Sequence, residues 1–279
     1  MHLLRKLISA IKPKPQVFVV KGSKPWYNSK KLGEYHVTNI DESIPCQATV
    51  TCKDVDDMSF VFYNCSKLTS IDLSNCDTSK VEYMNHMFGH CTYLTALDLS
   101  NFDTSKVTDI SGMFYDCFHI TTLDLSGFDT SKVKDMSLMF GSCFNLTELD
   151  LSNFNTSKVV NMGLMFDYCN KLTSINLSNF DTSKVENMYA MFRNCYSLTS
   201  LDLSSFDTSN VKDMAYMFKS CPRLTTIKGV IDMKSCECYE CYEDMFYDCP
   251  KLKDVKIKNP PSGFEIHACI SKSQYTIVS

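Results

Sequence analysis

Glycine, proline and tryptophan are scarce in this sequence, and long apolar runs are absent. The 279 residues include 9 glycines, 8 prolines and 1 tryptophan. So few glycines leave little room for phosphate-binding loops, and the glycine motifs of nucleotide-binding proteins and hydrolases do not occur. No apolar stretch approaches the roughly 18 residues that a membrane-spanning helix needs. We therefore expect neither an enzyme, nor a cofactor, nor a transmembrane segment.

A strong excess of charge of either sign is also lacking. Lys and Arg number 28 and Asp and Glu 32, so the net charge is −4. Residues 1–45 carry 8 basic and 3 acidic side chains, whereas residues 46–220 carry 12 and 21, a local charge of −9. Because an acidic body repels phosphate, nucleic acid is not an expected partner. Residues 1–45 are interpreted as a basic segment or an N-terminal cap.

The beginning of the sequence has no recognisable export signal. Its apolar stretch is broken by Arg5 and Lys6 and ends before Pro13. This stretch is too short for the apolar core of a signal peptide, and no small-residue cleavage site follows closely. A cytoplasmic location therefore stays open beside an exported one.

Cysteine and methionine, by contrast, are abundant, with 15 of each, and many cysteines follow a fixed interval. Phenylalanine keeps the same interval of 26 residues, which identifies a repeat protein. The cysteine series comprises Cys65, Cys91, Cys117, Cys143, Cys169, Cys195 and Cys221. The phenylalanine series comprises Phe62, Phe88, Phe114, Phe140, Phe166, Phe192 and Phe218.

Each repeat combines two hydrophobic periodicities. Leu97 and Leu99 flank a polar residue, as in a short strand with one buried face. After Asp103-Thr104-Ser105, interpreted as a helix N-cap, apolar spacings of three and one predict one face of a helix. The helical positions are Val107, Ile110, Met113, Phe114 and Cys117. The sequence therefore predicts an α/β solenoid, leucine-rich-repeat-like, with one short parallel strand and one helix per repeat.

The regular repeats divide the chain into three regions. Residues 46–250 form the predicted solenoid, because one repeat buries too little apolar surface to fold alone and must stack on its neighbours. Leu252, Val255 and Ile257 predict one last strand, and the lysines beside them would blunt the sheet edge. Residues 251–279 are therefore predicted to be a C-terminal cap, and we expect the protein to be a monomer.

One repeat carries a resemblance to a known family. The segment from Leu198 to Cys221, LTSLDLSSFDTSNVKDMAYMFKSC, and its sister copies closely resemble the BspA-like family of leucine-rich-repeat proteins, the 26-residue type of bacterial surface proteins and mycoplasma lipoproteins. The resemblance covers about residues 50–279. It implies a surface-exposed or secreted protein that binds other proteins and has neither enzymatic activity nor a cofactor. One departure is Phe102, which occupies the position of the usual Asn or Cys.

The cysteines fall into two groups. Those of the 26-residue series are interpreted as buried small apolar side chains, because equivalent side chains in a parallel stack point the same way and do not face each other. A second group, Cys236, Cys238, Cys241 and Cys249, has enough sulfur for a tetrahedral zinc site. A cysteine-rich irregular repeat without metal is the alternative. No metal site is predicted on this basis, and these four cysteines are kept as candidates.

The residues that follow each cysteine of the series differ from repeat to repeat, while the framework stays constant. Such variation is expected of a surface that faces a partner, and exposed aromatic side chains suit an anchor in a partner's pocket. Neutral drift at unconstrained positions is the alternative. The candidate partner-contact residues are Tyr93, Phe118, His119, Phe144, Tyr196 and Arg223.

Together these features predict a non-enzymatic protein–protein interaction scaffold, of the surface adhesion and recognition type that the resemblance implies. An intracellular repeat scaffold is the alternative, favoured by the missing export signal and by the free thiols. A zinc-binding protein centred on the cluster from Cys236 to Cys249 is a third hypothesis. The sequence does not identify the protein partner.

Overall fold

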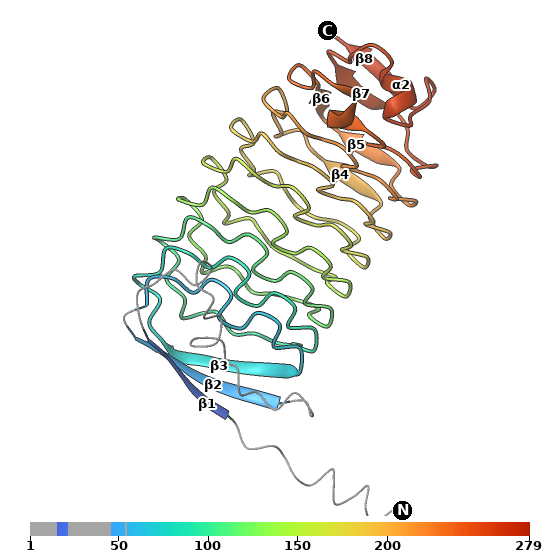
Figure 1. Ribbon diagram of the computed structural model, residues 1–279. Helices are drawn as coiled ribbons and strands as arrows, with labels where there is room; N and C mark the ends of the chain where they lie inside the picture. Colours follow the sequence, from blue (N-terminus) through green and yellow to red (C-terminus); the bar gives the residue numbers. More distant parts are fainter. Residues whose placement is uncertain (1–15, 22–45, 54) are drawn as a thin grey trace, which may run out of the picture.

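The chain winds into a stack of similar coils that rise along one axis (Figure 1). The computed structural model describes residues 16–21, 46–53 and 55–279. The first strands lie at one end of the stack, and the last strands and a short helix lie at the other. Bridged residues of neighbouring coils are 26 apart, so each repeat forms one coil. The architecture is a β-solenoid of about ten turns.

The strands pair in parallel, each with a strand of the neighbouring coil. The N-terminal sheet has the order β1-β2-β3, and the C-terminal sheet has the order β6-β7-β8. Two short strands, β4 and β5, pair with each other before the last sheet. The bounds are β1 (Gln16–Lys21), β2 (Cys46–Lys53), β3 (Leu68–Cys76), β4 (Ser200–Asp202), β5 (Thr226–Lys228), β6 (Val230–Asp232), β7 (Val255–Lys258) and β8 (Tyr275–Val278).

Single bridges and backbone hydrogen bonds hold the coils between these sheets together. The Thr108 N–H donates to the Glu82 carbonyl at 2.9 Å, and the Lys134 N–H donates to the Thr108 carbonyl at 2.8 Å. The backbone polar groups of one coil are thus satisfied by the next, as buried backbone requires. The bridged residues are Asp57, Tyr83, Asp109, Asp135, Asn161, Asn187 and Asp213.

The predicted helix in each repeat is wrong, and the solenoid is a β-solenoid rather than an α/β solenoid. Residues 107–117 show why, because their amide groups take alternating partners. The Gly112 N–H donates to the Ser137 carbonyl of the next coil at 2.7 Å, whereas the Met113 N–H donates to the Ile110 carbonyl at 3.2 Å. Bonds to the next coil and to the third residue back replace the bonds to the fourth residue back that define an α-helix.

Two backbone positions with positive φ in each coil also exclude a helix. Gly112 has a φ of 58° and Asp116 a φ of 60°, and a right-handed helix does not contain left-handed residues. Tight turns at Ile110–Met113 and Phe114–Cys117 bring apolar side chains back to the same side every three residues. Successive turns therefore produce the spacing that, in the sequence, resembles one face of a helix. The described helical segments are the 3₁₀-helix η2 (Tyr239–Tyr242) and the helix α2 (Phe264–His267).

The predicted core is confirmed even though its backbone is not helical. The phenylalanine rings of the 26-residue series are buried and stack on one another, with ring centroids 5.4 to 5.9 Å apart. Phe102 and its equivalents form a second buried series on the strand side of the coil. Because each ring contacts the rings above and below it, no coil buries its core alone.

The Asp-Thr-Ser motif joins neighbouring coils by hydrogen bonds and does not cap a helix. The buried Thr104 hydroxyl donates to the Asp129 carbonyl at 3.0 Å and accepts from the Asp129 N–H at 2.8 Å. The Asp103 carboxylate accepts from the Ser105 N–H at 3.0 Å and fixes the turn. The buried threonine series comprises Thr78, Thr104, Thr130, Thr156, Thr182 and Thr208.

The C-terminal end of the stack contains one strand more than predicted. β7 contains Val255 and Ile257 but is not the last strand, because β8 pairs along its outer side. Most of residues 1–45, predicted as a basic segment or cap, lie outside the described residues, and β1 within them pairs with β2. In the described ranges, no helix is both long and apolar enough to cross a membrane.

The threonine series gives a direct test of the coil-to-coil hydrogen bonds. Replacing Thr156 by Val keeps the shape but leaves the Asp181 N–H and carbonyl without the hydroxyl partner that lies 2.8 and 2.9 Å away. We expect Thr156→Val to lower the free energy of unfolding by about 2–4 kcal/mol. Thr156→Ser, the control, keeps the hydroxyl and should lose about 1 kcal/mol. Equal losses in urea denaturation would show that the hydroxyl is not what joins the coils.

Candidate binding surface

The predicted partner-contact residues lie along one corner of the solenoid, directly after the buried cysteine of each coil. Tyr93 and Tyr196 are 42% and 41% exposed. His119 and Arg223 are exposed as well. Phe118 and Phe144 were expected to be exposed but are half-buried. Their rings stack on each other with centroids 4.6 Å apart, and this contact covers part of each ring.

Side chains from three successive coils form one end of this corner. The Lys67 ammonium lies 4.9 Å from the centroid of the Tyr93 ring, and the Tyr93 ring stacks on the His119 ring at 5.1 Å. The His119 Nδ1 atom also contacts the Thr92 carbonyl. The stack therefore holds the exposed rings in fixed orientations, which reduces the entropy lost when a partner binds them.

The contacts continue along the stack to residues that sequence reasoning missed. The Phe144 ring meets the Tyr168 ring edge-on at 5.9 Å, and the Arg193 guanidinium lies 5.9 Å from the centroid of the Tyr168 ring. Tyr168 directly precedes the buried Cys169, and that position before the cysteine also varies between repeats. We call the following residues the aromatic strip: Tyr93, Phe118, His119, Phe144, Tyr168 and Tyr196.

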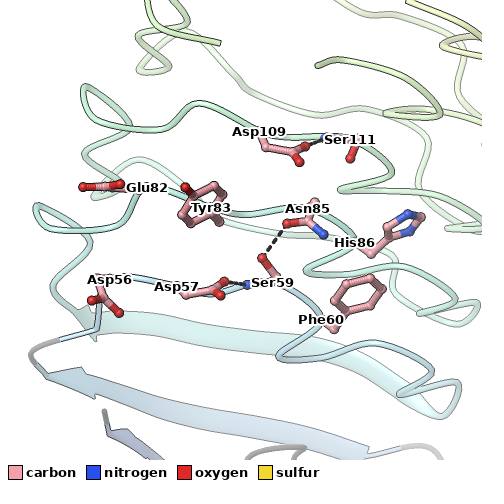
Figure 2. A pocket seen from close by; sticks show the side chains of 10 residues that line it. All are labelled: Asp56, Asp57, Ser59, Phe60, Glu82, Tyr83, Asn85, His86, Asp109 and Ser111. Atoms are coloured by element: carbon pink, nitrogen blue, oxygen red, sulfur yellow. Dashed lines mark hydrogen bonds between the residues drawn. The ribbon is translucent and has the colours of Figure 1, made fainter. Parts of the chain in front are cut away.

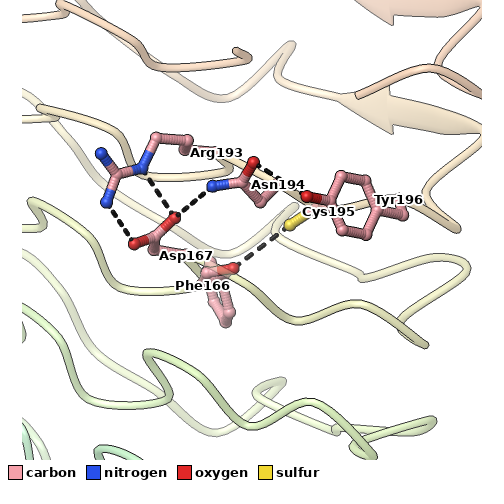
Figure 3. Close-up of polar contacts among 6 residues, drawn as sticks. All are labelled: Phe166, Asp167, Arg193, Asn194, Cys195 and Tyr196. Carbon is pink, nitrogen blue, oxygen red and sulfur yellow. Dashed lines mark hydrogen bonds and ion pairs between the residues drawn. The ribbon is translucent and has the colours of Figure 1, made fainter. Parts of the chain in front are cut away.

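Arg193, whose guanidinium lies over the Tyr168 ring, forms an ion pair with the buried carboxylate of Asp167 (Figure 3). The Arg193 guanidinium donates to both oxygens of the Asp167 carboxylate, at 2.9 and 2.7 Å. Burial raises the pKa of the Asp167 carboxyl, and the guanidinium offsets part of that rise. The Tyr196 hydroxyl donates to the Asn194 side-chain oxygen at 3.3 Å, so the same segment also orients this ring.

A pocket of about 690 Å³ opens on the first coils (Figure 2). Asp56 and Glu82 lie on one side of it, and Phe60 and His86 lie side by side on the other. The His86 ring stacks on Phe60 at 5.0 Å, and burial lowers the pKa of His86. The His86 ring fills the space beside Gly112. A Cβ atom at position 112 would come within 2.4 Å of the imidazole Nδ1 atom.

Two of the carboxylates that line this pocket, those of Asp57 and Asp109, have structural roles. The Asp57 carboxylate accepts from the Ser59 N–H at 2.8 Å, and the Asp109 carboxylate accepts from the Ser111 N–H at 2.9 Å. Both bonds fix turns of the same type as the Asp-x-Ser turn at Asp103. These groups therefore shape the coils, and sequence reasoning did not select them as a site.

The cysteines of the 26-residue series are buried, as predicted, and those from Cys91 to Cys221 are free thiols. The Cys143 Sγ atom donates to the Phe114 carbonyl at 3.2 Å, and burial raises the pKa of this thiol to about 12. Such thiols are protonated and unreactive at neutral pH. Outside the series, Cys52 of β2 and Cys76 of β3 form a disulfide that joins two strands of the N-terminal sheet.

The four cysteines considered for zinc do not form a metal-binding group in the described residues. Cys236 and Cys249 are buried and donate to the carbonyls of Val211 and Phe218, at 3.6 and 2.9 Å, whereas Cys238 is exposed. Within the part of the chain that the structure describes, no group of three or more His, Cys, Asp or Glu residues is arranged to hold a metal ion. The sulfur atoms therefore do not converge on one point, as tetrahedral coordination requires.

Comparison with known families agrees with the repeat architecture. A family model described as "Mycoplasma protein of unknown function, DUF285" matches residues 35–149 and again residues 137–259. The chain belongs to the DUF285 family. The two matches overlap and together span most of the solenoid, so this DUF285 protein carries the family pattern in both halves of the stack. No curated protein matches the chain.

The ion pair of Arg193 and Asp167 predicts a pH-dependent loss of stability. Arg193→Ala leaves the Asp167 carboxylate, which is only 7% exposed, without its cation, and should cost about 3 kcal/mol at pH 7. The folded-state pKa of Asp167 already exceeds its unfolded value, and the substitution raises it further. The folded state therefore takes up a proton first as the pH falls, and the loss should shrink between pH 7 and about pH 4.

A solvent-exposed ion pair provides the control. Lys212 and Glu186 lie 2.7 Å apart but are 65% and 49% exposed. Lys212→Ala should change the free energy of unfolding by less than about 0.5 kcal/mol at either pH. A loss in Arg193→Ala that stays constant between neutral and acidic pH would contradict the role assigned to Asp167.

Proposed function

We propose that this DUF285 protein is a non-enzymatic scaffold that binds another protein through the aromatic strip. The observation that carries the proposal is the contrast between a repeated framework and a varied corner. Buried Phe, Cys and Thr recur in coil after coil, while at the corner aromatic rings of neighbouring coils contact one another from Tyr93 to Tyr168. Clustered aromatic side chains on a rigid base are typical of energetic centres of protein interfaces.

Charge specifies the kind of partner. Of the seven second positions after the buried cysteines of the series, three are basic (Lys67, Lys171 and Arg223) and none is acidic, although residues 46–220 carry a local charge of −9. Scattered basic side chains without carboxylates on an otherwise acidic body favour a partner surface that is acidic at its rim. The proposed partner surface therefore combines acidic residues with apolar pockets for the tyrosine rings.

The resemblance of the repeats to BspA-like leucine-rich-repeat proteins supports placing this scaffold on a cell surface or outside the cell. The disulfide between Cys52 and Cys76 favours the same location, because such bonds persist in oxidising compartments. An intracellular scaffold is the second candidate, and the unpaired exposed thiols of Cys238 and Cys269 favour it. Protease treatment of intact cells, with immunoblots for the repeats and for a cytosolic protein, separates the two.

Substitutions in the strip test the proposal. Tyr93→Ala combined with Tyr196→Ala should weaken capture of a partner by at least about tenfold, because buried interface tyrosines contribute about 2 kcal/mol or more each. Tyr83→Ala combined with Tyr247→Ala is the matched control, since these rings are 44% and 50% exposed but lie outside the strip. Cross-linked proteins from cell-surface and cytosolic extracts would be quantified for each variant.

The expected result is at least one protein that the wild type and the control capture equally and the strip variant loses. The proposal fails if every captured protein is retained by the strip variant. A substrate turned over by the purified chain would contradict the non-enzymatic part of the proposal, whatever the binding result.

A further inference from the structure

The last full coil carries an exposed pair of cysteines outside the buried series. The spacing from Cys221 to Cys249 is 28 residues instead of 26, and the irregular segment between them contains η2. Cys238 directly precedes η2 and is exposed, and Cys241 lies within it and is partly exposed. The segment therefore presents a Cys-x-x-Cys sequence at the surface of the C-terminal end.

The backbone holds these two cysteines at the spacing a disulfide needs. The Cys241 N–H donates to the Cys238 carbonyl at 3.3 Å, which closes a turn between residues three apart. In such a turn the two Cα atoms lie less than about 7 Å apart. Disulfides join cysteines whose Cα atoms are about 4.4–6.8 Å apart, a range that this turn allows.

The other described free thiols lack one of these two properties. Those from Cys91 to Cys221 in the 26-residue series are buried and donate to backbone carbonyls. Cys236 is buried in the same manner. Cys269 is exposed, but its Sγ atom contacts the Asp244 carboxylate at 3.2 Å. Accessibility and a neighbouring thiol coincide at Cys238 and Cys241.

We propose that Cys238 and Cys241 form a reversible dithiol–disulfide site that exchanges with small-molecule disulfides. The Cys238 thiolate attacks one sulfur of the small disulfide, forms a mixed disulfide and releases one small thiolate. The Cys241 thiolate then attacks the Cys238 sulfur and displaces the second small thiolate. The two protons lost by the protein pass to the two released thiolates, so one disulfide is reduced for each one formed.

The surroundings make this a modification site rather than the centre of a fast oxidoreductase. The hydrogen bond with the Cys241 thiol and the nearby Glu240 side chain raise the pKa of Cys238 to about 11. Thiolate is the attacking form, so exchange is slow at neutral pH and accelerates as the pH rises. The site is argued from the turn geometry and is independent of the proposed partner binding.

A disulfide between Cys238 and Cys241 would constrain η2, which packs against α2. The buried Tyr242 ring of η2 packs against Phe264 at 5.9 Å, and the Tyr239 ring packs against His267 at 4.9 Å. Fixing the turn at Cys238 and Cys241 fixes the element on which the C-terminal helix rests. Oxidation therefore couples the redox state of this pair to the order of the C-terminal end.

Thiol counting on the full chain tests the proposal. The reduced protein is incubated with mixtures of oxidised and reduced glutathione, quenched in acid, alkylated under denaturing conditions and weighed by mass spectrometry. After proteolysis, the peptide from Ser235 to Lys251 of the wild type should carry two fewer alkyl groups after oxidation and regain both after dithiothreitol, which separates this pair from the disulfide of Cys52 and Cys76. Cys238→Ser and Cys241→Ser should each lower the yield of the internal disulfide by at least about tenfold.

Cys269→Ser is the matched control, because it removes an exposed thiol that has no thiol neighbour in the structure. This variant should lose two alkylation sites as the wild type does. The proposal is overturned if the wild type forms only mixed disulfides, or if Cys238→Ser still closes an internal disulfide in the peptide from Ser235 to Lys251. Alanine variants with unchanged circular dichroism spectra replace any serine variant that does not fold.

Discussion

Every coil of this protein depends on hydrogen bonds that it makes with its neighbours. Amide groups alternate between the next coil and the third residue back, and a buried threonine hydroxyl both donates to and accepts from the backbone one coil away. A polar backbone group left unpaired in the core costs about 1–3 kcal/mol. The backbone polar groups of one coil therefore find their hydrogen-bond partners only when the neighbouring coils are present. The aromatic rings of the core repeat with the same interval of 26 residues.

Much of this architecture could be predicted from the sequence. The one incorrect element, a helix in each repeat, was predicted for a physical reason. The 26-residue period, the parallel stacking and the buried Phe and Cys series follow from spacing alone. The helix was predicted because three-residue turns place side chains on one side as a helix does. Apart from Gly112, the left-handed residues of these turns are ordinary ones, such as His86, Leu138 and Asp116, so glycine rarely marks them in the sequence.

The candidate surface was only partly predictable for a similar reason. Variation between repeats located Tyr93, Tyr196 and their neighbours, because outward positions differ while framework positions recur. Tyr168 and Arg193 could be assigned to this surface only from the structure, because their contacts are with residues of neighbouring coils. The cysteines from Cys236 to Cys249 show the reverse case, in which short spacing in sequence does not bring four sulfur atoms together.

The buried framework residues recur every 26 residues and hold the coils together, so the corner residues can vary without disturbing the core. The proposed binding function depends on this variation. The central claim is thus that hydrogen bonds join coil to coil rather than run within helices. Far-UV circular dichroism of the purified full chain tests it most directly. The account predicts a spectrum of strands and turns with little helical signal. The strong double minimum of a protein with one three-turn helix in every repeat would contradict it.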